Sequence, residues 1–175
     1  MVAELLQDDL CEELNRLFEQ DIFKNPYNER QKLTAYPQDL PIPDTADIQD
    51  NTEIDEEGLG LSTSDRDKDD QFFPYAIVRT EEGSIKEAEA DQEVNITLLF
   101  GAWDDDKKNQ GHRHILHMIQ KVYERFAKFP ILADRYECEL PIEWATQDEP
   151  SWPYFFGGMN LKFRLLGIRR EDPNT

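Results

Sequence analysis

The sequence predicts an α+β fold, a two-layer sandwich in which about four mainly antiparallel strands are backed by two helices and accompanied by a long acidic loop. Two adjacent patterns carry this prediction. Residues 94–100 alternate apolar and polar side chains, which is typical of a strand with one buried face. Residues 111–129 carry apolar side chains three and four positions apart, so a helix there also has one buried face. A helix lying on a sheet buries both faces at once.

A second helix is expected at residues 2–20. Its apolar side chains again recur three or four positions apart, at Ala3, Leu6, Leu10, Leu14 and Leu17. Charged side chains occupy its other faces. This helix therefore also needs a sheet or a partner helix to cover its apolar side.

The stretch from residue 44 to residue 70 holds eleven acidic and two basic side chains. It offers few side chains to a core, so we expect an acidic flexible insertion within a single domain of residues 1–175. An insertion presented to a partner or a channel stays open, because long unstructured loops are uncommon in compact domains. The candidate lumen-facing or partner-facing acids are Asp50, Glu53, Asp55, Glu56, Glu57, Asp65, Asp67, Asp69 and Asp70.

Two hairpins are expected on either side of the central helix. Residues 72–79 and 94–100 predict the first. Residues 136–144 and 159–165 predict the second. The resulting order is helix, strand, strand, helix, strand, strand, with both helices on one face of the sheet.

The second hairpin carries two irregularities. Residues 136–144 alternate so that Leu140 and Trp144 are expected to point inward, while Pro141 predicts an edge strand or a bulge. A change of phase at Leu165 and Leu166 predicts another bulge.

Composition excludes some classes of function. A net charge of −19 repels phosphate backbones, so specific nucleic-acid binding is not expected. No apolar run is long enough for a bilayer, and the first residues lack the basic start of a secretory signal. Cys11 and Cys138 fall in different elements; one disulfide stays open, but no disulfide framework is indicated, and a reducing cytosol fits best.

Candidate metal ligands lie around the start of the central helix. Of His112, His114 and His117, only the last two share a helix face, and the i, i+4 spacing of zinc helices is missing. Asp104–Asp106 lacks the alternate spacing of calcium loops, and acids ahead of a helix favour its positive end without any metal. We therefore predict no metal and no cofactor.

Signatures of covalent catalysis are also missing. Ser84 and Ser151 lie outside any Gly-x-Ser-x-Gly elbow, and Cys138 takes the inward position of an inert thiol. Gly157-Gly158 lacks the third glycine and the helix of a dinucleotide site. The prediction is that the chain is not an enzyme.

Aromatic side chains indicate a possible site of association, because several of them fall in connectors between the predicted elements. They either pack within the core or form a patch that a neighbouring subunit completes. The candidate subunit or partner contacts are Phe72, Phe73, Trp103, Trp152, Tyr154, Phe155 and Phe156.

Five segments together resemble the tail-terminator (tail-completion) proteins of long-tailed bacteriophages and their prophages. They are Tyr36–Pro41, Phe73–Arg79, Leu98–Asp106, Gly111–Phe126 and Trp152–Gly157. The resemblance implies a helix-backed sheet and a homohexameric ring that caps the tail tube, ends its polymerisation and offers a surface to the head connector or stopper protein. It places the protein at the head-proximal end of the virion tail, and in the host cytoplasm during assembly. DNA would pass through the ring, and an acidic loop in the lumen would repel it.

Two other functions stay open at this stage. One is another head–tail joining component, such as a connector adaptor or a stopper. The other is a metal-dependent enzyme that uses the histidines and Asp104–Asp106. Ring formation and binding to tail tubes separate the first from a terminator, and a metal analysis tests the second.

Overall fold

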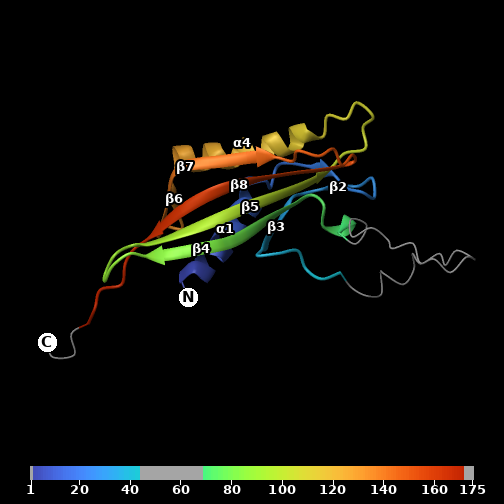
Figure 1. Cartoon of the computed structure of the whole chain (residues 1–175). Coiled ribbons are helices and arrows are strands. Elements are labelled where there is room, and N and C mark those ends of the chain that lie inside the picture. Colours follow the sequence, from blue (N-terminus) through green and yellow to red (C-terminus); the bar gives the residue numbers. More distant parts are fainter. Residues whose placement is uncertain (1, 44–68, 172–175) are drawn as a thin grey trace, which may run out of the picture.

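The computed structural model describes residues 2–43 and 69–171. Figure 1 shows a long twisted sheet with two helices packed against it. In chain order the elements are α1 (Val2–Leu17), β1 (Phe23–Lys24), β2 (Arg30–Gln31), β3 (Thr34–Pro37), the short 3-10 helix η2 (Asp70–Phe72), β4 (Tyr75–Ile85), β5 (Gln92–Trp103), α4 (His112–Lys128), β6 (Ile131–Leu132), β7 (Tyr136–Thr146) and β8 (Tyr154–Leu165).

The predicted four-stranded sandwich is wrong. The fold is a mixed α/β structure with a six-stranded sheet in the order β3-β4-β5-β8-β7-β6, beside a separate two-stranded sheet of β1 and β2. β3 runs parallel to β4, and the other neighbours in the large sheet are antiparallel. The missed strands have two to four residues, too few to display a period of two in the sequence.

Both expected hairpins are present, as β4–β5 and β7–β8. The edge or bulge predicted at Pro141 is confirmed: pairing of β7 with β8 shifts register between Glu139 and Glu143. The bulge predicted at Leu165 and Leu166 is wrong, because β8 pairs regularly with β5 and ends at Leu165. The change of phase there marks the end of the strand.

Both helices cover the same face of the sheet, as predicted. α1 packs on β3 and β4, and α4 packs on β5, β7 and β8. A single core joins them, in which α1 contributes Leu6, Leu10 and Leu14 and α4 contributes Met118 and Val122, all fully buried. β4 and β5 extend past the helices at the end of the sheet where the chain leaves β8 (Figure 1).

A buried ion pair ties the two helices together. Glu13 of α1 is only 5% exposed, and its Oε1 accepts a hydrogen bond of 2.5 Å from Nε of Arg125 in α4. The second carboxylate oxygen contacts the guanidinium of Arg16. Arg125 also donates to the carbonyl oxygens of Phe129 and Ile131, so it links α1, the end of α4 and β6.

Candidate interaction surfaces

An aromatic cluster covers one end of the sheet face that is turned away from the helices. Its buried members are Phe72, Phe73, Tyr75, Ile77 and Trp103, against which Tyr36, Leu40, Leu99, Tyr154 and Phe156 pack. The ring centroid of Phe73 lies 4.9 Å from that of Tyr75 and 5.3 Å from that of Tyr154. The cluster therefore joins η2 and the segment after it to β4, β5 and β8.

The predicted aromatic contacts are thus divided among three environments. Phe72, Phe73, Trp103, Tyr154 and Phe156 come together in this aromatic cluster. Phe155 lies in the main core on the opposite face, where its ring leaves no room for a Cβ atom at Gly111. Trp152 alone is well exposed, at 47%, and its Nε1 donates to the carbonyl oxygen of Asp106 over 3.2 Å. Most of this aromatic surface is used within the chain.

The predicted acidic contacts fall mainly outside the described residues. This holds for Asp50, Glu53, Asp55, Glu56, Glu57, Asp65 and Asp67. Asp69 and Asp70 lie at the start of η2, where the hydroxyl of Tyr154 donates to Oδ1 of Asp70 over 2.6 Å. Asp70 therefore helps to attach η2 to β8.

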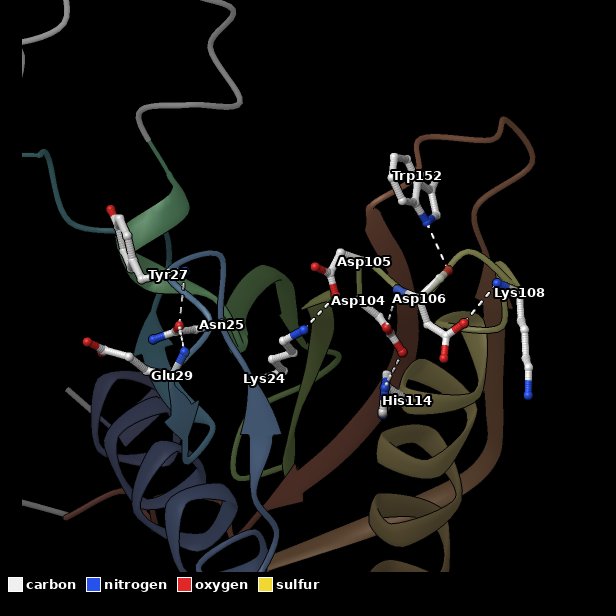
Figure 2. A network of polar contacts seen from close by, with 10 residues as sticks. All are labelled: Lys24, Asn25, Tyr27, Glu29, Asp104, Asp105, Asp106, Lys108, His114 and Trp152. Carbon is white, nitrogen blue, oxygen red and sulfur yellow. Dashed lines mark hydrogen bonds and ion pairs between the residues drawn. The ribbon is translucent and has the colours of Figure 1, made fainter.

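The loop between β5 and α4 is built on the three adjacent aspartates (Figure 2). Oδ2 of Asp104 lies 2.9 Å from Nε2 of His114 in the first turn of α4, and Oδ1 of Asp104 accepts the backbone N–H of Asp106. Oδ1 of Asp105 accepts a hydrogen bond of 2.6 Å from Nζ of Lys24, which lies in β1. Asp106 accepts the N–H of Lys108.

These contacts give Asp104–Asp106 a structural role. The carboxylates hold β1, the loop and α4 together, and Nζ of Lys24 also lies 5.4 Å from the ring centroid of Trp103. Asn25 completes this end of the molecule: it is 3% exposed, and its Oδ1 accepts the N–H groups of Tyr27 and Glu29. Across residues 2–43 and 69–171, no group of three or more potential metal ligands is assembled.

A second histidine contact lies further along α4. Nε2 of His117 is 3.2 Å from Oδ1 of Asp21, and Oδ2 of Asp21 is bound by Nζ of Lys121. Burial acts to raise the pKa of the Asp21 carboxyl, but the hydrogen bonds from Lys121 and His117 outweigh it, and the pKa falls below its usual 3.8. His114 and His117 thus bind carboxylates from two different segments and do not converge on one site.

Replacing Asp21 tests this contact through pH. A carboxyl whose pKa is lower in the folded state contributes stability above the unfolded pKa and loses it as pH falls through the folded pKa. We expect Asp21→Asn to lower the free energy of unfolding by about 1 kcal/mol at pH 7. The difference from the wild type should shrink as pH falls below 3.8. Urea unfolding between pH 7 and pH 3 measures it, and a difference that stays constant with pH contradicts the assignment.

The two cysteines are free and buried. Burial raises the pKa of the Cys11 and Cys138 thiols to about 12. At neutral pH both are therefore thiols and not thiolates, which makes them poor nucleophiles. The predicted inward position of Cys138 is confirmed.

The sequence reasoning missed an exposed apolar surface along α4 and β7. We call it the α4–β7 surface; its exposed members are Tyr123, Phe129, Ile131, Leu140 and Trp144, with exposures of 45%, 67%, 46%, 75% and 56%. A groove of about 560 Å³ lies within it, between α4 and β7. The groove is floored in part by buried Phe126 and Cys138.

The burial expected for Leu140 and Trp144 as inward positions is wrong, since both side chains are exposed. In the bulge, three residues of β7 lie opposite Leu161 alone on β8. The extra residues interrupt the alternation that had placed Leu140 inside. In the sequence, Pro141 indicates an irregularity in this strand, but it does not indicate which side chains are exposed as a result.

Comparison of the sequence with protein-family models and with curated proteins finds no match. Within the described residues, no helix is long and apolar enough to cross a membrane.

Proposed function

We propose that this chain is a structural subunit of a homohexameric ring that caps the tail tube of a long-tailed bacteriophage or prophage. Its partners are further copies of itself, the tail tube protein and the head connector or stopper protein. The proposal rests on the resemblance of the five segments Tyr36–Pro41, Phe73–Arg79, Leu98–Asp106, Gly111–Phe126 and Trp152–Gly157 to tail terminators. The fold supports it through the surfaces that it leaves uncovered.

The observation that carries the proposal is the α4–β7 surface. Tyr123 of α4 and Leu140 of β7, which are 45% and 75% exposed, line one groove. Phe129 after α4, Ile131 in β6 and Trp144 in β7 are three more large apolar side chains that are at least 46% exposed. Single exposed apolar residues are ordinary, but a contiguous apolar patch is typical of a site of association. A subunit of an assembly needs such a patch.

The edges of the sheet also suit head-to-tail assembly. On the outer side of β4, β3 pairs only with Tyr75–Val78, and on the outer side of β7, β6 pairs only with Tyr136 and Glu137. Within the described part of the chain, the rest of each edge has no partner strand. β4, β5, β8 and β7 alternate in direction, so β7 of one subunit and β4 of the next would meet antiparallel. Head-to-tail contacts of this kind close into rings when the rotation between subunits allows it.

The first test is the mass and shape of the purified protein. Light scattering over a concentration series should approach six subunits, and negative stain should show rings, either alone or after addition of tail tubes. Adding the protein to growing tubes should stop their elongation. A protein that neither forms rings nor caps tubes contradicts the proposal, and one that binds portal complexes instead of tubes favours the connector alternative.

Leu140→Asp tests the surface that carries the proposal. Leu140 is 75% exposed, so the folded monomer should tolerate the change, with a free energy of unfolding within about 0.5 kcal/mol of the wild type. A carboxylate in a subunit interface is costly, and ring formation should weaken by about tenfold or more. Ile22→Asp is the matched control, because Ile22 is also exposed, at 60%, and lies outside the α4–β7 surface. Equal assembly by both variants contradicts the role of this surface.

A further inference from the structure

Each edge of the large sheet carries one short strand, and the two short strands lie toward opposite ends of the sheet (Figure 1). On one edge, β3 covers β4 only at Tyr75–Val78. On the other edge, β6 covers β7 only at Tyr136 and Glu137. In the part of the chain that the structure describes, the remainder of each edge is open to a further strand.

Single hydrogen bonds mark where each covered part ends. Beyond β3, the side-chain Oε1 of Gln38 accepts the N–H of Thr80 in β4 over 3.1 Å. Beside β6, the carbonyl oxygen of Pro130 accepts the N–H of Cys138 in β7 over 2.8 Å. The open parts are therefore residues 81–85 of β4 and residues 139–146 of β7.

The pairing of the strands shows that each short strand is level with the open part of the opposite edge. When the ladder partners are followed from β4 through β5 and β8 to β7, Val78 is level with Trp144 and Ser84 is level with Glu137. β3 thus lies level with the open end of β7, and β6 lies level with the open end of β4. A second copy placed beside the first, without displacement along the strands, would fill both open parts at once.

The outer side of β3 can accept hydrogen bonds but cannot donate them. Thr34 and Gln38 direct their N–H groups towards β4, so Ala35 and Pro37 face outward. The N–H of Ala35 already donates to Oδ1 of Asn15 in α1 over 2.8 Å, and proline has no N–H. The described backbone of β3 therefore suits a neighbouring strand that supplies donors.

β7 supplies a donor at the matching level. The N–H of Gln147 donates to the carbonyl oxygen of Phe156 in β8, so the alternation of an antiparallel ladder directs the N–H of Thr146 to the open edge. Thr146 is level with Ala76, which pairs with Ala35. In a second copy at the same level, the carbonyl oxygen of Ala35 would lie opposite the N–H of Thr146.

Apolar side chains are exposed on both edges at the other end of the sheet. Beside β7 they are Phe129 and Ile131, which are 67% and 46% exposed. On the opposite edge Ile85, at the end of β4, is 62% exposed. The start of α1 lies near the end of β4 (Figure 1), and it exposes Val2 and Leu5 at 41% and 46%. Contact between the two edges would remove both groups from water.

We propose that the α4–β7 surface of one copy binds the edge formed by α1, β3 and β4 of a second copy, at the same level along the strands. β3 of the second copy lies beside the open part of β7, and β6 lies beside the open part of the second copy's β4. β7 and the second copy's β4 keep opposite directions, with the two short strands between them.

The contact is head-to-tail, because two β3 edges facing one another would offer acceptors without donors. This inference rests on the proposed ring, since the ring supplies the second copy. It adds which surface of the neighbour meets the α4–β7 surface and in which register.

Cross-linking between two variants tests the register directly. Ile131 pairs with Glu137, which is level with Ser84, so Ile131 of one copy and Ser84 of the next lie side by side. Neighbouring strands are about 4.8 Å apart, which is within reach of a disulfide. A mixture of Ile131→Cys and Ser84→Cys proteins should therefore form a disulfide-linked dimer on mild oxidation.

Three controls accompany this cross-link. Each variant oxidised alone reports any reaction with the buried Cys11 and Cys138. A mixture of Ile131→Cys and Ile22→Cys should remain unlinked. A mixture of Glu143→Cys and Ser84→Cys should also remain unlinked, because Glu143 is level with Arg79 and not with Ser84. A disulfide in this last mixture in place of the expected one would show copies displaced along the strands and would overturn the register.

Leu5→Asp measures the apolar part of the contact. Urea unfolding of the monomer should be unchanged, because Leu5 is partly exposed and an acid near the start of a helix is favourable. Assembly should weaken by about tenfold or more, since a carboxylate would be buried against Phe129 and Ile131. Ile22→Asp is the control at an exposed site outside the contact. Equal assembly by Leu5→Asp and Ile22→Asp contradicts the contact.

The outcomes separate this inference from the proposed function. Wild-type rings without the link between Ile131→Cys and Ser84→Cys, and with full assembly of Leu5→Asp, overturn the register and leave the ring standing. The link in a protein whose wild type forms no closed rings supports the register and overturns the ring. Absence of both overturns both.

Discussion

Arg125→Met should lower the free energy of unfolding by about 3 kcal/mol, because it removes one partner of a buried ion pair. The carboxylate of Glu13 is almost completely buried between α1 and α4. Without Arg125, the cation that still contacts it in the described part of the chain is Arg16, whose side chain is 74% exposed and offers a contact well screened by water. The variant also removes the hydrogen bonds from Arg125 to the carbonyl oxygens of Phe129 and Ile131.

A double variant identifies the source of that loss. When both members of a buried pair become apolar, no charge is left without a partner, and stability is commonly recovered. Glu13→Leu/Arg125→Met should therefore be more stable than Arg125→Met alone in urea unfolding. Glu12→Leu, one position away on an exposed part of α1, should change stability by less than about 0.5 kcal/mol. A double variant that is less stable than Arg125→Met would show that the two side chains do not act as a pair.

The elements that sequence reasoning found are those with enough residues to display a period. α4 and β5 are 17 and 12 residues long. The periodic spacing of their apolar residues predicted both elements and the face that each of them buries. β6 has two residues, and β3 has four that include Pro37, so neither shows a pattern. They form only because longer neighbours offer them an edge, which is a property of the assembled sheet.

The candidate surfaces were harder to predict for a related reason. The alternation in residues 136–144 correctly placed Tyr136 and Cys138 inside, but Leu140 in the bulge and Trp144 beyond it are exposed. Aromatic residues in connectors suggested an interface, whereas most of them cover the second face of the sheet. Sequence pattern shows that a side chain is apolar, but only the fold shows whether the chain itself covers it.

Phe73→Ala, a substitution in the aromatic cluster, should lower the free energy of unfolding of the isolated monomer by about 3–5 kcal/mol. Phe73 is 2% exposed, and its ring meets Tyr75, Tyr154 and Phe156 at centroid distances between 4.9 and 6.0 Å. Removing it leaves a cavity among rings carried by strands of the sheet, which cannot collapse without moving the sheet. Urea unfolding at a concentration where the protein is monomeric measures the effect.

Two controls decide whether this cluster belongs to the monomer or to an interface. Trp152→Ala changes the exposed aromatic residue of the same region and should cost less than about 1 kcal/mol. Phe73→Leu keeps most of the apolar volume and should cost less than the alanine variant. If the cluster served chiefly to bind a second subunit, Phe73→Ala would leave the monomer's unfolding unchanged and weaken assembly instead. A large loss in the monomer assigns these rings to the fold and leaves association to the α4–β7 surface, which the chain itself leaves uncovered.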